Sequence, residues 1–302
     1  MPLQLIRGIH NLKNYQGPSV VTIGAFDGMH LGHQAVIKSL DKFPGKKVVI
    51  LFEPLPKEFF SKTNMPRLSR LRDKLKYLKS MGVDAVLCIK FDQKFSELSA
   101  QDFIDKILIQ GLNTRHLIIG DDFKFGFKRQ GDFDLLNTQK SFKTIPTETY
   151  EQNNKRVASS WVRSAVMSGD FELAKSLLGR PYVLEGKVQH GDKNGRKLGF
   201  PTLNIGLSKP MAVSGVYAVK VRGIGNVERL AVANIGTRPT FKLGLRRFLE
   251  VHLLNFEGDC YGLTISVEFI KKIRDEKRFE SLEALKEQIK KDIKTVSDLI
   301  FI

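Results

Sequence analysis

The sequence predicts a protein of two classes, α/β plus β: an N-terminal doubly wound parallel sheet and a C-terminal antiparallel barrel with a terminal helix. A chain of 302 residues is long for one hydrophobic core, which favours two domains. Up to Arg180, short apolar runs alternate with helical patterns, as in a parallel sheet. From Tyr182 onward, short strand patterns follow one another without long helices between them, as in a barrel. We therefore expect domains at residues 1–180 and 181–302.

The first domain shows a regular order of strands and helices. Residues 20–23 are β-branched, as expected for a strand buried on both faces, and a helix should begin near Leu31 or His33. Residues 67–79 place leucines three and four apart, which predicts an amphipathic helix with a basic face. The other expected elements are an edge strand or entry loop at 3–17, strands at 48–52, 84–90 and 115–119, and helices at 100–110 and 171–178.

Glycines and histidines follow the first buried strand. Gly24, Gly28 and Gly32 permit a tight backbone and the close approach of a ligand. Backbone N–H groups at the start of a helix favour an anion, and His30 and His33 add hydrogen-bond donors or positive charge there. A zinc site is the alternative, but no third His or Cys lies nearby to complete it. We expect a receptor for a triphosphate.

Two further segments of this domain suit a ligand. Residues 120–126 combine two acids, two aromatics and two glycines at the end of a strand, although an acidic turn with two core phenylalanines has the same composition. Ser159 or Ser160 is a candidate helix N-cap that could hold a phosphate, with Arg163 adding positive charge. The alternative for Arg163 is a structural arginine at a helix start.

The second domain is predicted to contain six strands and one helix. Its expected strands span 182–189, 202–205, 215–222, 228–235, 247–254 and 263–273. Ser281 is expected to cap a final amphipathic helix over 281–301, with Leu282, Leu285, Ile289 and Ile293 on one face.

Chemistry-bearing residues also occur on these strands. Thr202 and Asn204 are two apart, so on a strand they face the same side, and their oxygens suit Mg²⁺ with phosphate and water. Such a pair is more often structural when it stands alone. Residues 186–199 supply glycines and basic side chains for a phosphate-binding loop. Glu250 and His252 share a strand face.

Composition bounds the partners and the compartment. The chain holds 49 Lys and Arg against 32 Asp and Glu, a formal net charge of +17, which favours anionic ligands. These cations are spread along the chain without a basic tail or RNA-binding aromatic motif, so we expect no nucleic-acid partner. No apolar run could span a membrane, and residues 1–10 lack a signal-peptide pattern.

The two cysteines indicate a reducing compartment, because they form no disulfide framework. Cys88 lies in the apolar run 85–89, so a core residue is the better interpretation than a nucleophile. Cys260 falls in the other predicted domain. Together with the absence of a membrane segment, this predicts a cytoplasmic protein.

The motifs resemble, in order and in both halves, those of the bacterial bifunctional FAD synthetases (riboflavin kinase/FMN adenylyltransferase). Residues 24–33 match G-x-F-D-G-x-H-x-G-H, residues 120–126 match G-D-D-F-x-F-G, and residues 199–204 match G-F-P-T-x-N. Residues 233–241 are similar to the kinase flap, and residues 272–279 to a segment that borders the flavin. In the 159–163 segment, Trp161 stands where the family has threonine.

The resemblance implies two reactions: phosphorylation of riboflavin by Mg-ATP, and transfer of an adenylyl group from ATP to FMN with release of pyrophosphate. Flavin would then be substrate and product, not a redox cofactor, and Mg²⁺ would accompany ATP. The implied catalytic residues are Glu250 as base for the riboflavin 5′-hydroxyl, and His30, His33 and Arg163 at the phosphates.

The resemblance also implies binding residues. Those for ATP are Gly24, Phe26, Asp27, Gly32, Ser159, Ser160, Gly186, His190, Gly191, Arg196 and Gly199. Those for flavin are Asp122, Phe123, Phe125, Asn234, Thr237, Arg238, Arg274 and Glu276, with Thr202 and Asn204 as metal ligands.

Two other functions remain open at this point. One is a basic, flavin-responsive binding module without catalysis, which the altered segment around Trp161 favours slightly. The other is a kinase whose N-terminal domain has degraded, against which the intact His30, His33 and Asp122 argue. For partners we expect ATP, riboflavin, FMN and FAD, no membrane, and a monomer or weak homo-oligomer.

Overall fold

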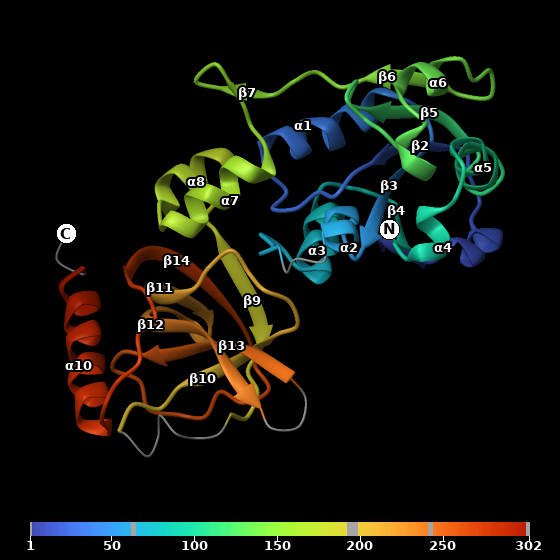
Figure 1. The fold of residues 1–302 in the computed structure, drawn as a ribbon. Coiled ribbons are helices and arrows are strands. Elements are labelled where there is room, and N and C mark those ends of the chain that lie inside the picture. The colour runs from blue at the N-terminus through green and yellow to red at the C-terminus, as the bar shows by residue number, and fades with distance from the viewer. Residues whose placement is uncertain (1, 62–64, 192–198, 241–243, 300–302) are drawn as a thin grey trace. The chain divides into compact units, whose positions relative to one another are not determined.

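The computed structural model describes residues 2–61, 65–191, 199–240 and 244–299, with the side chains of 237–247 excepted. The chain forms two compact units (Figure 1). The first comprises Met1–Met65 and Arg70–Ser159, and the second comprises Pro66–Ser69 and Ser160–Ile302. We describe each unit by itself.

The first unit is built on a six-stranded sheet of order β1-β4-β3-β2-β5-β6, whose neighbouring strands all pair in parallel. Its strands are β1 Gln4–Arg7, β2 Ser19–Ile23, β3 Lys46–Glu53, β4 Ala85–Lys90, β5 Thr114–Ile119 and β6 Lys143–Pro146. A small hairpin, β7 Glu151–Gln152 and β8 Lys155–Arg156, follows. The predicted parallel sheet is confirmed, with β6 as an additional strand.

Helices cover both faces of this sheet. Along β2, Val21 and Ile23 join one core with α5 (Ala100–Phe103) and η3 (Ile104–Ile109), whereas Val20 joins the other core with α1 (Leu31–Ser39) and α3 (Leu71–Ser80). This alternation is the reason why apolar residues point to both faces of the strand. The helices are α1 Leu31–Ser39, α2 Pro56–Ser61, α3 Leu71–Ser80, α4 Gln93–Ser96, α5 Ala100–Phe103 and α6 Phe133–Asn137; η1 Ile9–Asn14, η2 Leu40–Lys42 and η4 Phe127–Arg129 are 3₁₀ turns, and η3 Ile104–Ile109 is a π-helix.

The strand order reverses at β2, which places the carboxyl ends of β2 and β5 side by side. From β2 the chain adds β3 and β4 on one side and then returns to pair β5 on the other side of β2. Open α/β sheets bind ligands at such switch points. The loops that leave β2 and β5, residues 24–30 and 120–126, therefore share this edge.

Two predicted helices of this unit differ in the structure. The helix expected at 67–79 begins at Leu71, because the Asp73 carboxylate accepts a hydrogen bond from the Arg70 N–H (3.0 Å) and fixes the start there. The helix expected at 100–110 changes after Phe103 into the wider turns of η3.

The second unit contains a six-stranded antiparallel sheet of order β10-β13-β12-β11-β14-β9. Its strands are β9 Val183–Lys187, β10 Leu203–Leu207, β11 Gly215–Gly223, β12 Gly225–Thr240, β13 Gly244–Leu253 and β14 Thr264–Arg274. Beyond β9, Gln189 pairs with Asn204 of β10, which brings the two ends of the sheet together as in a barrel. The predicted barrel is confirmed, although Thr202 lies just before β10 rather than within it.

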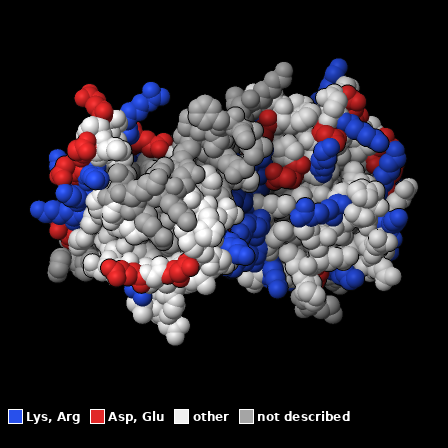
Figure 2. All heavy atoms as spheres, turned by 90° about the horizontal axis from the view of Figure 1, so that it is seen from below, with Lys and Arg blue, Asp and Glu red and all other residues white. Residues whose placement is uncertain are grey.

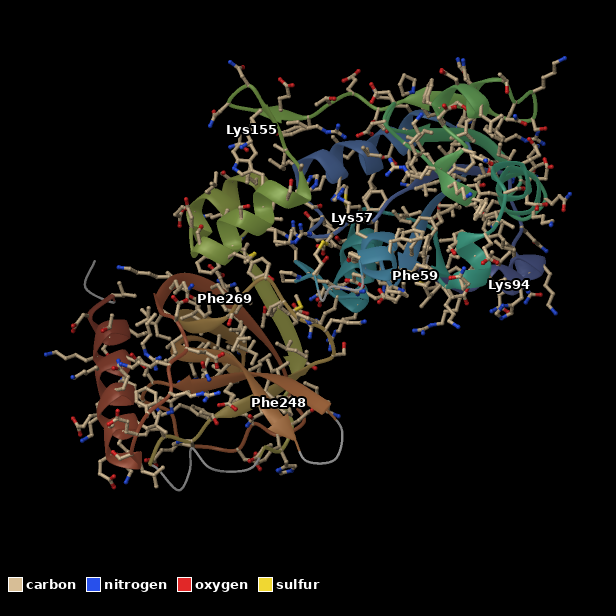
Figure 3. The ribbon with its side chains drawn as sticks, in the orientation of Figure 1. Lys57, Phe59, Lys94, Lys155, Phe248 and Phe269 are labelled. Atoms are coloured by element: carbon tan, nitrogen blue, oxygen red, sulfur yellow. The ribbon has the colours of Figure 1, made fainter. Side chains whose placement is uncertain are left out.

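Two helices before the barrel belong to the second unit, α7 Ser159–Ser168 from Ser160 onward and α8 Phe171–Leu178. The Phe171 ring of α8 lies 5.8 Å from Tyr217 and 5.7 Å from Phe269, which is labelled in Figure 3. Gly179 ends α8 in the left-handed conformation, with φ 69°. Burial of these aromatic rings holds α8 on the barrel.

A four-residue segment, Pro66–Ser69, also joins the second unit although it precedes α3 in the chain. The Arg67 N–H donates to the Pro210 carbonyl (2.9 Å), and the Ala212 N–H donates to the Arg67 carbonyl (2.8 Å). The Tyr182 hydroxyl donates to the Leu68 carbonyl (3.1 Å). These bonds explain why Leu68 is buried here and not on the expected helix.

The terminal helix α10 spans Leu282–Asp298, and its N-cap Ser281 accepts from the Ala284 N–H (3.1 Å) as predicted. The packing of α10 differs from the predicted apolar face at its N-terminal end, because Leu282 is exposed. Asp292 is buried on this helix and holds the Arg274 guanidinium through two nitrogens, at 3.0 and 2.8 Å. This pair fastens the end of β14 to α10.

The remaining sequence expectations concern cysteines, membrane segments and charge. Cys88 and Cys260 are free and buried, and burial raises the pKa of both thiols.

Among the described residues, no helix has the length and apolarity to cross a membrane. On the face drawn in Figure 2, acidic side chains lie among the Lys and Arg side chains.

Candidate functional site

The loop after β2 carries the histidine motif in a constrained conformation. Phe26 and Met29 are buried, yet both have positive φ, 46° and 49°. Non-glycine residues adopt this region at a cost, and such strain persists where the surroundings over-determine it, often at ligand sites. Gly28 has φ 83°, which glycine adopts without that cost.

His30 is the N-cap of α1 and shapes the helix start. Its Nδ1 accepts from the His33 N–H (3.3 Å), so in the neutral ring the proton sits on Nε2. The two imidazoles are stacked with centroids 3.6 Å apart. The His30 ring therefore caps the helix through Nδ1 and carries its proton on Nε2.

His33 is held neutral. Burial, then the neighbouring His30 and the charge of Lys74, lower its pKa well below 6.5. Its Nδ1 is buried and has no hydrogen-bond partner among the described residues. An unpaired buried nitrogen at a ligand edge marks a place where a polar ligand group would be accommodated.

Two glycines of this motif allow rings to approach the backbone. A Cβ on Gly32 would lie 3.2 Å from the His30 ring and 3.3 Å from the Val157 carbonyl oxygen. A Cβ on Gly24 would lie 3.0 Å from the Phe26 ring. Phe26 in turn lies 5.0 Å from the His33 imidazole, so the motif packs as one group.

The loop after β5 contributes one exposed acid and two packed rings. Asp122 is exposed and pairs with Arg156 of β8 at 3.1 Å. Phe125 is buried and stacks at 5.5 Å on the partly buried Phe123. The sequence alternative of core phenylalanines therefore describes Phe125 well, and the flavin-binding role of these residues stays a prediction.

The serines and the arginine of the 159–163 segment fall in different units. Ser159 ends the first unit, and its hydroxyl donates to the Asp27 carbonyl (2.9 Å), which ties it to the histidine loop. Ser160 and Arg163 belong to the second unit, where Arg163 Nε donates to the Pro66 carbonyl (2.8 Å). Their roles at a phosphate stay predictions.

An aromatic cluster that the sequence interpretation missed lies where β3 and β4 end. Phe59 and Phe60 follow β3 on α2, and Phe91 directly follows β4. Ring centroids lie 5.4 Å apart for Phe59 and Phe91 and 5.6 Å apart for Phe60 and Phe91. Phe60 is 66% exposed, and Phe59 is labelled in Figure 3. The sequence held one signal for this cluster: two consecutive phenylalanines, Phe59 and Phe60, shortly after the prolines that end the strand.

In the second unit, strand register brings three predicted residues into one row. Glu250 of β13 is the register partner of Asn204 on β10 and of Asn234 on β12. Register partners of neighbouring strands share a face of the sheet. Leu249 and Val251 on either side of Glu250 are buried, so Glu250 lies on the face opposite to the buried one.

A cavity of about 230 Å³ lies at the start of β10. Its lining includes residues 201–203, Leu253 and residues 256–261. The ring of His190 lies 3.7 Å from that of Tyr261, which the sequence interpretation had not singled out. His252 donates through Nδ1 to the Pro201 carbonyl (2.8 Å), which fixes the residue before Thr202.

Two glycines pack tightly against Asn204 and Ile205 of β10. The Asn204 amide nitrogen donates to the Thr202 carbonyl (3.3 Å), and a Cβ on Gly191 would lie 2.6 Å from that nitrogen. Gly186 packs against Ile205, whose side chain a Cβ would overlap. Gly199 is exposed with φ 89°, and Arg196 lies outside the described residues.

The structure describes the side chains of only some of the predicted flavin residues of the second unit. Thr237 and Arg238 lie in β12, and their side chains are outside what the structure describes. Arg274 is engaged by Asp292, as described above. The Glu276 carboxylate lies against Gly236 of β12, so closely that a Cβ there would overlap it. Glycine at 236 thus allows the segment after β14 to lie on β12.

The fold and these two sites define a class: a nucleotide-binding α/β domain with an H-x-G-H loop, joined to a riboflavin-kinase-like barrel. The family model for FAD synthetase matches residues 12–161, and that for riboflavin kinase matches residues 178–300. The chain is 47% identical over 300 residues to the bifunctional riboflavin kinase/FMN adenylyltransferase of Escherichia coli (strain K12), covering 96% of each. The chain belongs to the family of bifunctional riboflavin kinases/FMN adenylyltransferases.

Two further comparisons agree with this assignment of family. The protein of the same name from Haemophilus influenzae is 45% identical, with 97% of this chain and 98% of the relative covered. Among solved structures, a protein titled macrolide-efflux protein from Streptococcus pneumoniae matches with a TM-score of 0.76 and 28% identity. The match covers 98% of this chain and 99% of that one, so both units of the fold are shared.

Proposed function

We propose that this protein makes FAD from riboflavin in two ATP-dependent steps, one in each unit. The second unit transfers the γ-phosphoryl group of ATP to the riboflavin 5′-hydroxyl and yields FMN. The first unit transfers the adenylyl group of ATP to the FMN phosphate and releases pyrophosphate. The proposal is supported by the presence of both sets of motifs, by the parallel pairing of β2 with β5, and by the register of Glu250 with Asn204 and Asn234.

For adenylyl transfer, the FMN phosphate is already an anion, so it needs no base to become a nucleophile. The site must instead bind a triphosphate and stabilise charge that develops on the leaving pyrophosphate. His30 donates from Nε2, and His33 stays neutral at pH 7 because its pKa is lowered. Gly24, Phe26, Asp27 and Gly32 shape the backbone, and Ser159, whose hydroxyl donates to the Asp27 carbonyl, is the serine of this unit next to the loop.

The flavin ring of FMN binds near the ends of the same sheet. Asp122, Phe123 and Phe125 border the acceptor on the β5 side. The exposed Phe60, packed edge-to-face with Phe59 and Phe91, offers an aromatic ring on the β3 side. Aromatic rings pack on one another in offset or edge-to-face arrangements, which suits an isoalloxazine ring.

For phosphoryl transfer, Glu250 orients the riboflavin hydroxyl and accepts its proton. Thr202 and Asn204 would hold Mg²⁺: both offer neutral oxygens, and Asn204 donates through its nitrogen, so its oxygen remains for a cation. The metal would neutralise charge on the ATP phosphates when bound. Gly186, His190, Gly191, Arg196 and Gly199 contribute to the ATP site, with His190 and Tyr261 beside the cavity.

Flavin contacts in the barrel come from Asn234, Thr237 and Arg238 on β12 and from the segment with Arg274 and Glu276. We take residues 1–180 and 181–302 as the two functional domains. We place the enzyme in the cytoplasm, which its two free, buried cysteines support. It acts as a monomer or weak homo-oligomer without nucleic acid, since Lys and Arg are spread along the chain.

Chromatography of flavins tests this function directly. Incubation with riboflavin, ATP and Mg²⁺ is expected to yield FMN and then FAD, and incubation with FMN and ATP is expected to yield FAD alone. Omission of Mg²⁺ should stop riboflavin phosphorylation. Formation of FMN without FAD would show that the protein is a kinase only. Unchanged riboflavin in every reaction would favour a binding module without catalysis.

A further inference from the structure

The loop that carries the histidines is held by three side chains at alternate carbonyl groups. Lys74 Nζ donates to the Ala25 carbonyl at 2.7 Å. The Ser159 hydroxyl donates to the Asp27 carbonyl, and Gln34 Nε2 donates to the Met29 carbonyl, each at 2.9 Å. In a trans peptide the N–H points opposite to the C=O. Fixing three carbonyls therefore also fixes the directions of the intervening N–H groups.

Lys74 differs from Ser159 and Gln34, the other two residues that bond to the loop, because it is charged and only 1% exposed. Lysine is almost never fully buried, since removal of its ammonium from water is costly unless the group is compensated. It lies on α3, between Leu71 and Leu78, which pack into the core beneath the loop. At this position its ammonium reaches the Ala25 carbonyl, so the lysine links α3 to the histidine loop.

The charge acts on the same histidines that face the ligand. Lys74 is one of the causes that lower the pKa of His33, after burial and His30, so its ammonium lies within electrostatic reach of that ring. In a buried site, charges are screened less than at the surface. The same field favours a bound anion at the loop.

We propose that Lys74 is a positioning residue for adenylyl transfer: its buried ammonium fixes the Ala25 carbonyl, and with it the strained histidine loop, and adds positive charge beside the ATP phosphates. The proposal rests on the adenylyltransferase activity proposed above. Gln34 assists at Met29, while Lys74 supplies both the hydrogen bond and the charge.

The test compares Lys74→Met with Lys79→Met, an exposed lysine on the same helix. FAD formation is measured with ATP and FMN varied in turn. For Lys74→Met we expect KM for ATP to rise about 10-fold or more and kcat to fall, because a misplaced loop binds phosphates poorly. KM for FMN should stay within about twofold, which shows that the first unit is folded. Lys79→Met should resemble the wild type.

Two additional variants make the result decisive. Lys74→Arg keeps a charged donor and is expected to restore KM for ATP to within about threefold of the wild type. Lys74→Gln keeps an N–H donor without the charge, and it replaces Lys74→Met in the comparison if the latter does not fold. An unchanged KM for ATP in the folded neutral variant, even with a lower kcat, would overturn the proposal and leave Lys74 a structural role.

Riboflavin phosphorylation, measured on the same samples, should be unchanged in every variant, since Lys74 lies in the other unit. If the wild-type protein forms no FAD from FMN, the proposed adenylyltransferase function fails. If the wild type forms FAD and the neutral variant binds ATP equally well, only the inference about Lys74 fails.

Discussion

Replacing His30 with alanine is expected to lower FAD formation from supplied FMN about 100-fold or more, the loss typical of removing one donor from a charge-stabilising site. His30 offers Nε2–H to the phosphates, and its Nδ1 caps α1. Riboflavin phosphorylation should remain within about twofold, because its residues lie in the second unit. Both rates are measured by flavin chromatography on one preparation.

His30 has two roles, as the N-cap of α1 and as a hydrogen-bond donor to the phosphates, and the variant His30→Asn tests them separately. Asparagine is a good N-cap and can still accept the His33 N–H, but it lacks the imidazole donor. We expect this variant to be as inactive in FAD formation as His30→Ala. Wild-type FAD formation by His30→Asn would show that His30 only caps the helix.

The converse change is Glu250→Gln, which is expected to lower riboflavin phosphorylation about 100-fold or more while FAD formation from FMN continues. Glutamine keeps the size of the side chain but cannot accept the hydroxyl proton. Glu250 stands in register between Asn204 and Asn234, so it is central to the row that would face riboflavin and ATP. Initial rates of FMN formation at saturating Mg-ATP provide the measurement.

The matched control is Glu228→Gln on β12, where the carboxylate pairs with Lys220 and Arg222 away from that row. It should leave both reactions unchanged. A Glu250→Gln protein that phosphorylates riboflavin at the wild-type rate would remove Glu250 from the catalytic role.

Local signals were sufficient for much of the fold. The helix predicted at 171–178 is α8, with Gly179 at its end in the left-handed conformation. The expected start near Leu31 is the start of α1. Strands in both halves could be predicted because a strand buried on one face alternates apolar and polar residues, and a strand buried on both faces is a continuous apolar run. The parallel pairing of the strands in the first unit follows from the alternation of strands and helices along the chain.

Long-range contacts explain most of what the sequence did not reveal. Leu68 fits a helical spacing, yet its segment bonds to Pro210 and Ala212, which lie far along the chain. Lys74 also fits the basic face of that helix and is buried instead. No local pattern distinguishes a solvated lysine from one that meets a distant carbonyl. We find no local reason for the π-helix after Phe103.

The shared strand face of candidate residues in the second unit could be predicted from their spacing. The two-residue spacing predicted one face for Glu250 and His252, and the sheet adds Asn204 and Asn234 in register with Glu250. The Phe59–Phe91 contact and the His190–Tyr261 stack join separate segments, so only the folded chain reveals them.

Mixing two single-site variants tests most directly whether one polypeptide carries two independent ATP sites. His30→Ala should convert riboflavin only to FMN, and Glu250→Gln should leave riboflavin unchanged. Their equimolar mixture with riboflavin, ATP and Mg²⁺ is predicted to make FAD, since FMN released by one variant is used by the other. A mixture of these folded variants that accumulates FMN without FAD, or makes neither product, would contradict two independent sites.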